Sequence, residues 1–290
     1  MKAIALSLLI IGLLSPATEL WAQNGVEARS VAARSAPDPA QQVLDMARML
    51  RSNDLVGLVQ AAVPPRAYEE MRTAYELHRT EPTSESERAE FAEKLAKLAA
   101  PDAVDQLMVE IEPKLEEARP KAPSAILMGI GAAQLALLSD ESDLTDDQRA
   151  ALQRALPGFQ DWVTRTDFLS SSSLREALTL VTDAVRSTGI RDIEQLKSMS
   201  LEQAIAQAET VLAASKQALL IYGLDLDAIA DSMQVEVVSM DATTARVRTT
   251  VTVFDAPIFA EQDLVLLDGR WYGKQAAEHW STHLARHSRG

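Results

Sequence analysis

The stretch MQVEVVSMDATTARVRTTVTVF (residues 233–254) decides the fold class, because the hydrophobic period changes here from 3.6 residues to two. Val235 and Val237 alternate with polar neighbours in its first half. In its second half Ala245 and Val247 face one way, and Arg246 and Arg248 face the other. We therefore expect two antiparallel strands with one face on the core and one partly in solvent.

Two further strands and a helix follow this stretch. The segment from Phe259 to Leu267 has strand composition, and Asp268-Gly269 is a strong hairpin signal that leads into a strand at Arg270-Trp271-Tyr272. Helical spacing then runs from Gln275 to about His287. Residues 233–290 are thus expected to form a four-stranded antiparallel sheet and a short C-terminal helix.

Residues 38–232 have the spacing of a multi-helix bundle. Asp38-Pro39 begins a helix that reaches Ala62 with an interruption near Ser52-Asn53, and Pro64-Pro65 starts the next one. Capping boxes are expected at Ser84–Glu87, Thr145–Gln148, Ser173–Glu176 and Ser200–Gln203. Breaks are expected at Pro101, Pro113, Pro120, Pro157-Gly158, Gly189 and Gly223. The fold class is therefore α+β and helix-rich, with eight or nine short helices before the sheet.

The N-terminal segment is typical of a secretory signal peptide. Residues 1–22 hold a positive charge at Lys2, an apolar run from Ala3 to Leu14 that is too short to cross a bilayer, and a small residue at Ala22. Cleavage is expected between residues 17 and 22, and residues 23–37 then form a flexible lead-in. These features predict a bacterial periplasmic protein.

Cysteine content and charge narrow the class of protein further. The chain has no cysteine, so no thiol is present to carry a lipid, and we expect a protein that is not a lipoprotein. The net charge is −14, and residues 23–232 carry about −13 of it. Such a field repels phosphate backbones and anionic lipids. We expect no nucleic-acid partner and no stable membrane insertion after signal cleavage.

Three segments carry a resemblance to a known family. VEVVSMDATTARVRTTVTVF (235–254) followed by LVLLDGRWYGK (264–274) resembles the terminal strands of periplasmic domains of the NTF2-like cone fold. LRSNDLVGLVQAAVPPRAYEEM (50–71) is similar to their first helix and the segment after it. The resemblance covers about a fifth of the chain, and the long helical region departs from it. It implies no functional residues, because the family includes enzymes, carriers and inert modules.

Three of the four histidines form a strip on the C-terminal helix. His279, His283 and His287 lie four residues apart, and imidazoles at that spacing can bind a transition metal. The alternative is an exposed polar face on a helix that docks through its neighbouring strip, namely Ala277, Trp280 and Leu284.

The fourth histidine, His78, shares a helix face with Tyr68, Met71 and Tyr75. This position favours a half-buried packing residue, and the alternative is a catalytic base in an enzyme built from scattered acids. Phosphate-binding, dinucleotide-binding, zinc-protease and nucleophile motifs do not occur in the sequence. We therefore expect no cofactor.

Ala122 to Ser139 is a run of residues without a charge. We interpret it as the central buried helix of the bundle; the alternatives are the wall of an apolar ligand cavity and a membrane contact. Together these features favour a soluble, non-enzymatic periplasmic protein that binds an envelope protein or an apolar ligand between sheet and bundle. The alternatives are an envelope enzyme and a metal-binding protein.

Overall fold

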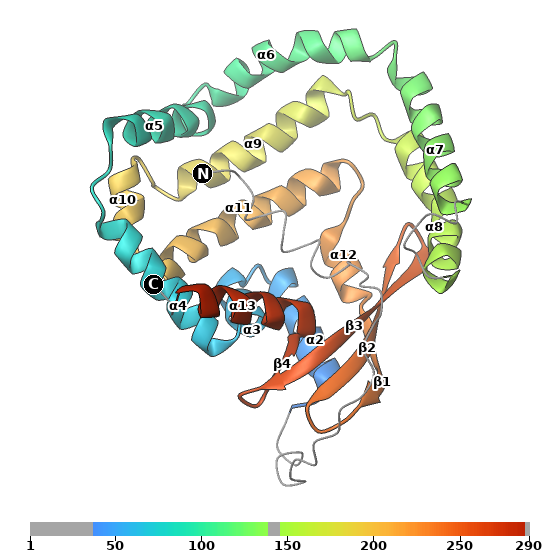
Figure 1. Cartoon of the computed structure of the whole chain (residues 1–290). Helices are drawn as coiled ribbons and strands as arrows, with labels where there is room; N and C mark the ends of the chain where they lie inside the picture. The colour runs from blue at the N-terminus through green and yellow to red at the C-terminus, as the bar shows by residue number, and fades with distance from the viewer. Residues whose placement is uncertain (1–36, 139–145, 288–290) are drawn as a thin grey trace.

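The computed structural model describes residues 37–138 and 146–287, and within them the fold is α+β and helix-rich, as predicted (Figure 1). The helices are α2 (Pro39–Arg51), α3 (Leu55–Ala62), α4 (Pro65–Thr80), α5 (Glu85–Ala99), α6 (Ala103–Ala118), α7 (Ala122–Leu138), α8 (Asp146–Arg165), α9 (Ser171–Ser187), α10 (Ile193–Ser198), α11 (Leu201–Ile221), α12 (Leu226–Asp231) and α13 (Lys274–His287). The strands are β1 (Gln234–Met240), β2 (Thr244–Val253), β3 (Ala256–Leu267) and β4 (Arg270–Gly273).

The helices are arranged in successive arcs. Figure 1 shows α5, α6 and α7 along the outer edge of the molecule, with α8 running back beside α7. Helix α9 lies inside this arc and packs on both α5 and α6, and α11 lies inside α9. The outer arc is therefore one helix thick, and its helices α5 and α6 have their inner face on α9.

The sheet is an antiparallel meander in the order β1-β2-β3-β4. Its solvent face has a ladder of cross-strand ion pairs, in which Arg246 pairs with Asp263 and Arg248 with Glu261. Helix α2 covers the other face, and the shared core consists of Val43, Ala245, Val247, Leu264 and Trp271. One sheet face is thus buried and the other is partly in solvent, as the alternation predicts, although Tyr272 on this second face is buried.

Helix α2 also closes the edge of the sheet. The Gln42 side chain donates to the Trp271 carbonyl and accepts from the Trp271 amide at 3.0 Å. The backbone groups of Trp271 at the open edge of β4 are therefore hydrogen-bonded by a side chain. The indole Nε1 of Trp271 donates to the Pro37 carbonyl at 2.7 Å. These bonds tie α2 and the residue before its N-cap to β4.

Several helix ends agree with the sequence and one does not. The interruption near Ser52-Asn53 separates α2 from α3, and the capping boxes at Ser84 and Ser200 are present. Thr145 lies outside the described residues. The box expected at Ser173 is wrong: α9 begins earlier, because the Ser170 hydroxyl accepts from the Ser173 amide and takes the capping role.

Two of the expected breaks are wrong as well. Pro113 lies inside α6 and Pro157 inside α8. Pro113 is exposed, so water can reach the carbonyl that its missing N–H leaves unpaired. Gly158 has a packing role instead, because a Cβ there would collide with the Phe254 carbonyl in the β2–β3 turn.

The position of helix α7 shows that our interpretation of the uncharged stretch as a buried central helix is wrong. This helix lies on the outer edge, packed mainly against α8, with Leu127, Met128 and Leu135 about 70% exposed. The reason is topological: α9 and α11 occupy the interior, so the α7–α8 hairpin has only one face on the rest of the molecule. Among the described residues, no helix is both long enough and apolar enough to span a bilayer.

A buried lysine joins three helices. Lys216 of α11 is 6% exposed, and its Nζ donates to the Leu50 and Arg51 carbonyls at 2.6 and 3.1 Å and to Asp227 at 2.7 Å. Those carbonyls end α2, where the helix dipole favours a cation. This charge therefore fixes α11 against α2 and α12.

Candidate functional site: a cleft beside helix α7

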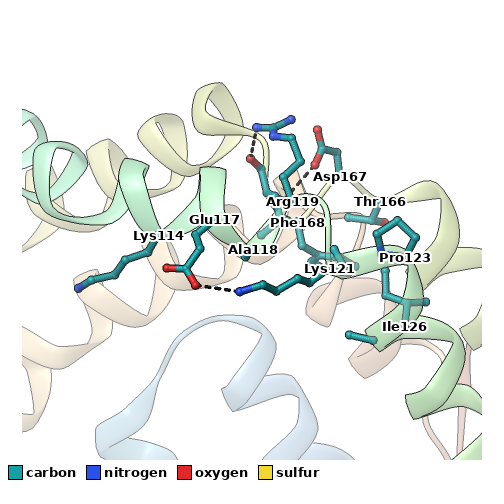
Figure 2. Close-up of a pocket in the computed structure, with 13 residues that line it drawn as sticks. Lys114, Glu117, Ala118, Arg119, Lys121, Pro123, Ile126, Thr166, Asp167 and Phe168 are labelled. Atoms are coloured by element: carbon teal, nitrogen blue, oxygen red, sulfur yellow. Dashed lines mark hydrogen bonds and ion pairs between the residues drawn. The ribbon is translucent and has the colours of Figure 1, made fainter.

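A cleft of about 680 Å³ opens where the outer arc turns from α6 into α7. The loop between α8 and α9 closes its other side, and Figure 2 shows the residues gathered around it. Its apolar lining comprises Ala118, Ala122, Pro123, Ala125, Ile126, Phe168 and Leu169. Its polar lining comprises Lys114, Glu117, Arg119, Lys121, Thr166 and Asp167.

An aromatic cluster holds one wall of the cleft in place. The Phe168 ring stacks on Tyr222 at 5.9 Å and meets Trp162 edge-on at 5.1 Å. The Trp162 indole donates to the Tyr222 carbonyl at 2.6 Å and packs against Phe254 of the β2–β3 turn. Burial raises the pKa of the Tyr222 hydroxyl, which keeps it neutral. Phe168 is fixed on its inner side and still 37% exposed.

The rim of the cleft is charged and internally paired. Lys121 lies 2.8 Å from Glu117 (Figure 2). Lys114 lies 3.3 Å from Glu110, one turn earlier. Arg119 donates to the Leu169 carbonyl at 3.0 Å and so bridges the two walls. Because these charges already have partners, the rim positions the walls, and the apolar lining is the part open to a ligand.

The chemistry of this lining favours binding. Most of the wall consists of alanine, proline, isoleucine, leucine and phenylalanine, and the volume lies within the range of about 300–1,000 Å³ typical of small-molecule sites. The Asp167 carboxylate accepts from the Leu169 amide at 3.0 Å and thereby shapes its own loop. The arrangement can desolvate an apolar group between Ile126 and Phe168.

His78 lies beside a second, smaller hollow of about 190 Å³. Its Nδ1 is 2.8 Å from Glu81 Oε2, and its side chain is 59% exposed, so the expectation of a half-buried packing residue is wrong. Lys197 donates across the hollow to the Glu81 carbonyl at 2.6 Å. Hydrogen bonds from Ser84 lower the pKa of Glu87, and burial raises that of Tyr75. Glu87 therefore stays ionised as a helix cap.

The C-terminal histidine strip is only partly within the described residues. His279 is exposed, whereas the side chains of His283 and His287 lie outside the description, so the metal site stays a prediction. The docking strip is confirmed where it is described: Ala277 is buried, and Trp280 packs on the cluster around Tyr68 of α4. The side chain of Leu284 lies outside the description.

Sequence reasoning missed the cleft as a site. Its walls come from α6, α7 and the α8–α9 loop, whose residues are about 40 positions apart in the chain, and no motif joins them. The signal that pointed there was the uncharged stretch from Ala122, for which the wall of an apolar cavity was one alternative. A comparison of the chain with protein-family models, with curated proteins and with solved structures finds no match.

Proposed function

We propose that this chain is a non-enzymatic binding protein of the bacterial cell envelope, exported to the periplasm in soluble form, and that its ligand is an apolar group held in the cleft beside α7. We assign the ligand to the α6–α7 corner, where the cleft lies, in place of the position between sheet and bundle that the sequence suggested. The resemblance to NTF2-like domains is compatible with a carrier but supplies none of these residues.

One observation carries the proposal: Phe168 is held rigidly by its neighbours while its outer face is open to a cleft of about 680 Å³. An exposed aromatic ring that is already ordered loses little entropy when a ligand covers it. Ile126 and Ala122 provide the facing wall from α7. A preformed apolar wall on both sides is the usual form of a small-molecule site.

The proposal is tested with the neutral fluorescent probe N-phenyl-1-naphthylamine and the mature protein. The probe should bind saturably, with a rise in its fluorescence as it leaves water. Ile126→Asp places a charge in the wall, and Ala125→Trp fills the opening, so each should weaken binding at least tenfold, equivalent to about 1.4 kcal/mol.

Leu127→Asp is the matched control. This residue is the next one on α7, is 68% exposed and does not line the cleft, so its substitution should leave the affinity for the probe unchanged. Native mass spectrometry of protein purified from its own envelope then identifies the natural ligand. Equal probe binding by Ile126→Asp and the parent would show that the cleft is not the site.

The second candidate is an envelope enzyme, and the His78–Glu81 pair beside its hollow is the observation that favours it. An imidazole hydrogen-bonded to a carboxylate can act as a general base. The hollow is smaller than the usual range for substrates, which ranks this function second.

A panel of chromogenic esters, phosphates and glycosides tests the enzymatic candidate. A hydrolytic activity that is lost in His78→Ala and retained in His279→Ala, an exposed histidine elsewhere, would establish it. Equal activity of the two variants would instead assign the turnover to a contaminant and remove the candidate.

A further inference from the structure

The outer face of α7 is a concentration of exposed apolar side chains on an acidic protein. Leu127, Met128 and Leu135 are 68, 70 and 71% exposed, and α7 packs mainly against α8 on its other side. These three residues do not line the cleft beside Phe168. The face therefore has no role in the ligand site proposed above.

The spacing of this face makes it complementary to itself. Met128, Gly131 and Leu135 follow one another at intervals of three and four residues, so they share one side of the helix. A Cβ built on Gly131 meets nothing within 4 Å. If two α7 helices cross antiparallel with the two-fold axis at Gly131, Leu135 of each copy lies opposite Leu127 of the other, because each is four residues from the axis. The bare glycines at the axis then allow close approach.

The distribution of charge also favours a second copy of this chain as the partner of α7. The whole of α7 is uncharged, while the chain carries a net charge of −14. A cationic partner would be drawn to the acidic helices and would gain nothing from α7. A second copy presents an equally uncharged helix, so the two acidic bodies can meet there without opposing like charges.

We infer that α7 is a self-association surface through which two copies of this chain pair by their α7–α8 hairpins, forming a four-helix layer about a two-fold axis at Gly131. Antiparallel hairpins packing in this way are a common form of helix bundle. The inference is separate from the ligand-binding proposal, because the two surfaces use different faces of α7.

The size of the face sets the strength of the dimer. A helix of 17 residues is about 25 Å long and about 10 Å wide, which is small beside the roughly 800 Å² per partner of a standard interface. We therefore expect a reversible dimer with a dissociation constant on the order of 10–100 µM. A lipid surface is a poorer occupant, because the face lacks the aromatic and basic residues of interfacial helices.

Sedimentation equilibrium of the mature protein over a range of concentrations provides the first test. The dimer should tighten several-fold between 0.1 M and 1 M salt, because the screening length falls from about 10 Å to about 3 Å and the repulsion between acidic bodies is removed. Leu135→Lys should weaken it at least tenfold. Leu77→Lys is the matched control, at an apolar residue of α4 that is 68% exposed, and should not.

The absence of cysteine allows a second test by disulfide trapping. Gly131→Cys should give a covalent dimer under mild oxidation, because residues at a two-fold axis approach within the roughly 4.4–6.8 Å that a disulfide needs. Leu77→Cys should remain monomeric. Ile126→Asp should still dimerise even though it loses the probe, so failure of one proposal is distinguishable from failure of the other.

Three results would overturn the inference. One is a protein that is monomeric at every concentration. Another is a dimer that persists in Leu135→Lys, or that does not become covalent when Gly131→Cys is oxidised. The third is α7-dependent binding to phosphatidylcholine vesicles without a dimer, which would assign the face to lipid.

Discussion

The sheet with α2 and the outer arc of α5, α6 and α7 differ in how much of their apolar surface is buried. In the first region Val247, Leu264 and Trp271 are at most 3% exposed and come from three different strands. In the second, α5 has no buried residue among those described, and α6 buries only Ala103 and Met108. The comparison indicates that stability is concentrated around the sheet, while the binding surfaces that we propose lie on the thinly packed arc.

The physical reason lies in how each element satisfies its backbone. A strand needs its neighbours for hydrogen bonds, so the sheet forms only together with its long-range core. A helix satisfies its own backbone, and the arc adds local ion pairs four residues apart, such as Lys94 with Glu90 and Lys97 with Glu93. The arc can therefore leave apolar side chains in solvent and still be helical.

The largest effect is expected from Trp271→Ala. This substitution removes a buried ring and its hydrogen bond to the Pro37 carbonyl, so it should lower the free energy of unfolding by about 3–5 kcal/mol. Urea unfolding followed by circular dichroism measures the change. A loss below about 1 kcal/mol would mean that the sheet core is not where stability is concentrated.

The next effect is expected from Lys216→Met, which keeps the aliphatic stem and deletes the ammonium. The Leu50 and Arg51 carbonyls lose a donor, and the free energy of unfolding should fall by about 2 kcal/mol. Lys94→Met, at an exposed ion pair, is the control and should cost less than about 0.5 kcal/mol. Equal effects of the two substitutions would contradict the role assigned to Lys216.

A smaller effect is expected at Asp241 in the β1–β2 turn. Hydrogen bonds from the Thr244 side chain and from the Thr243 and Thr244 amides lower its pKa from 3.8 to about 2. Because the pKa is lower in the folded protein, the ionised carboxylate of Asp241 stabilises the fold at pH values above 3.8. This stability is lost as the pH falls toward the folded-state pKa of about 2. Asp241→Asn should cost roughly 0.5 kcal/mol at pH 7, since the turn is exposed, and nothing near pH 2. Thermal unfolding at both pH values tests this, and a constant difference would contradict it.

The smallest effect is expected on the arc, at Val109 of α6. Its side chain is 75% exposed, so Val109→Ala should change the free energy of unfolding by less than about 0.5 kcal/mol. The same urea experiment as for Trp271→Ala gives the measurement. A loss comparable to that of Trp271→Ala would break the contrast between the two regions and show that another surface covers α6.

Much of the fold could be read from local patterns. The alternation in 233–254, the Asp268-Gly269 turn and the Ser52-Asn53 interruption each predict an element that the structure contains. The errors occurred where a local signal competes with packing. Gly158 suggests a helix break in the sequence, but in the structure it allows the turn at Phe254 to approach α8. Ser170, and not Ser173, is the N-cap of α9.

By itself, the sequence determined the change from helices to strands near Met233 and the face of β2 that lies on the core, because these follow from hydrophobic period. The number of helices was wrong: eight or nine were expected before the sheet, and the described residues form eleven. Only the tertiary structure decided where each helix lies. The uncharged stretch from Ala122 has the composition of a buried helix, yet α9 and α11 occupy the interior, so α7 is left outside with an exposed face and a cleft at its start. Burial depends on which elements compete for the same core, and that competition involves contacts far apart along the chain.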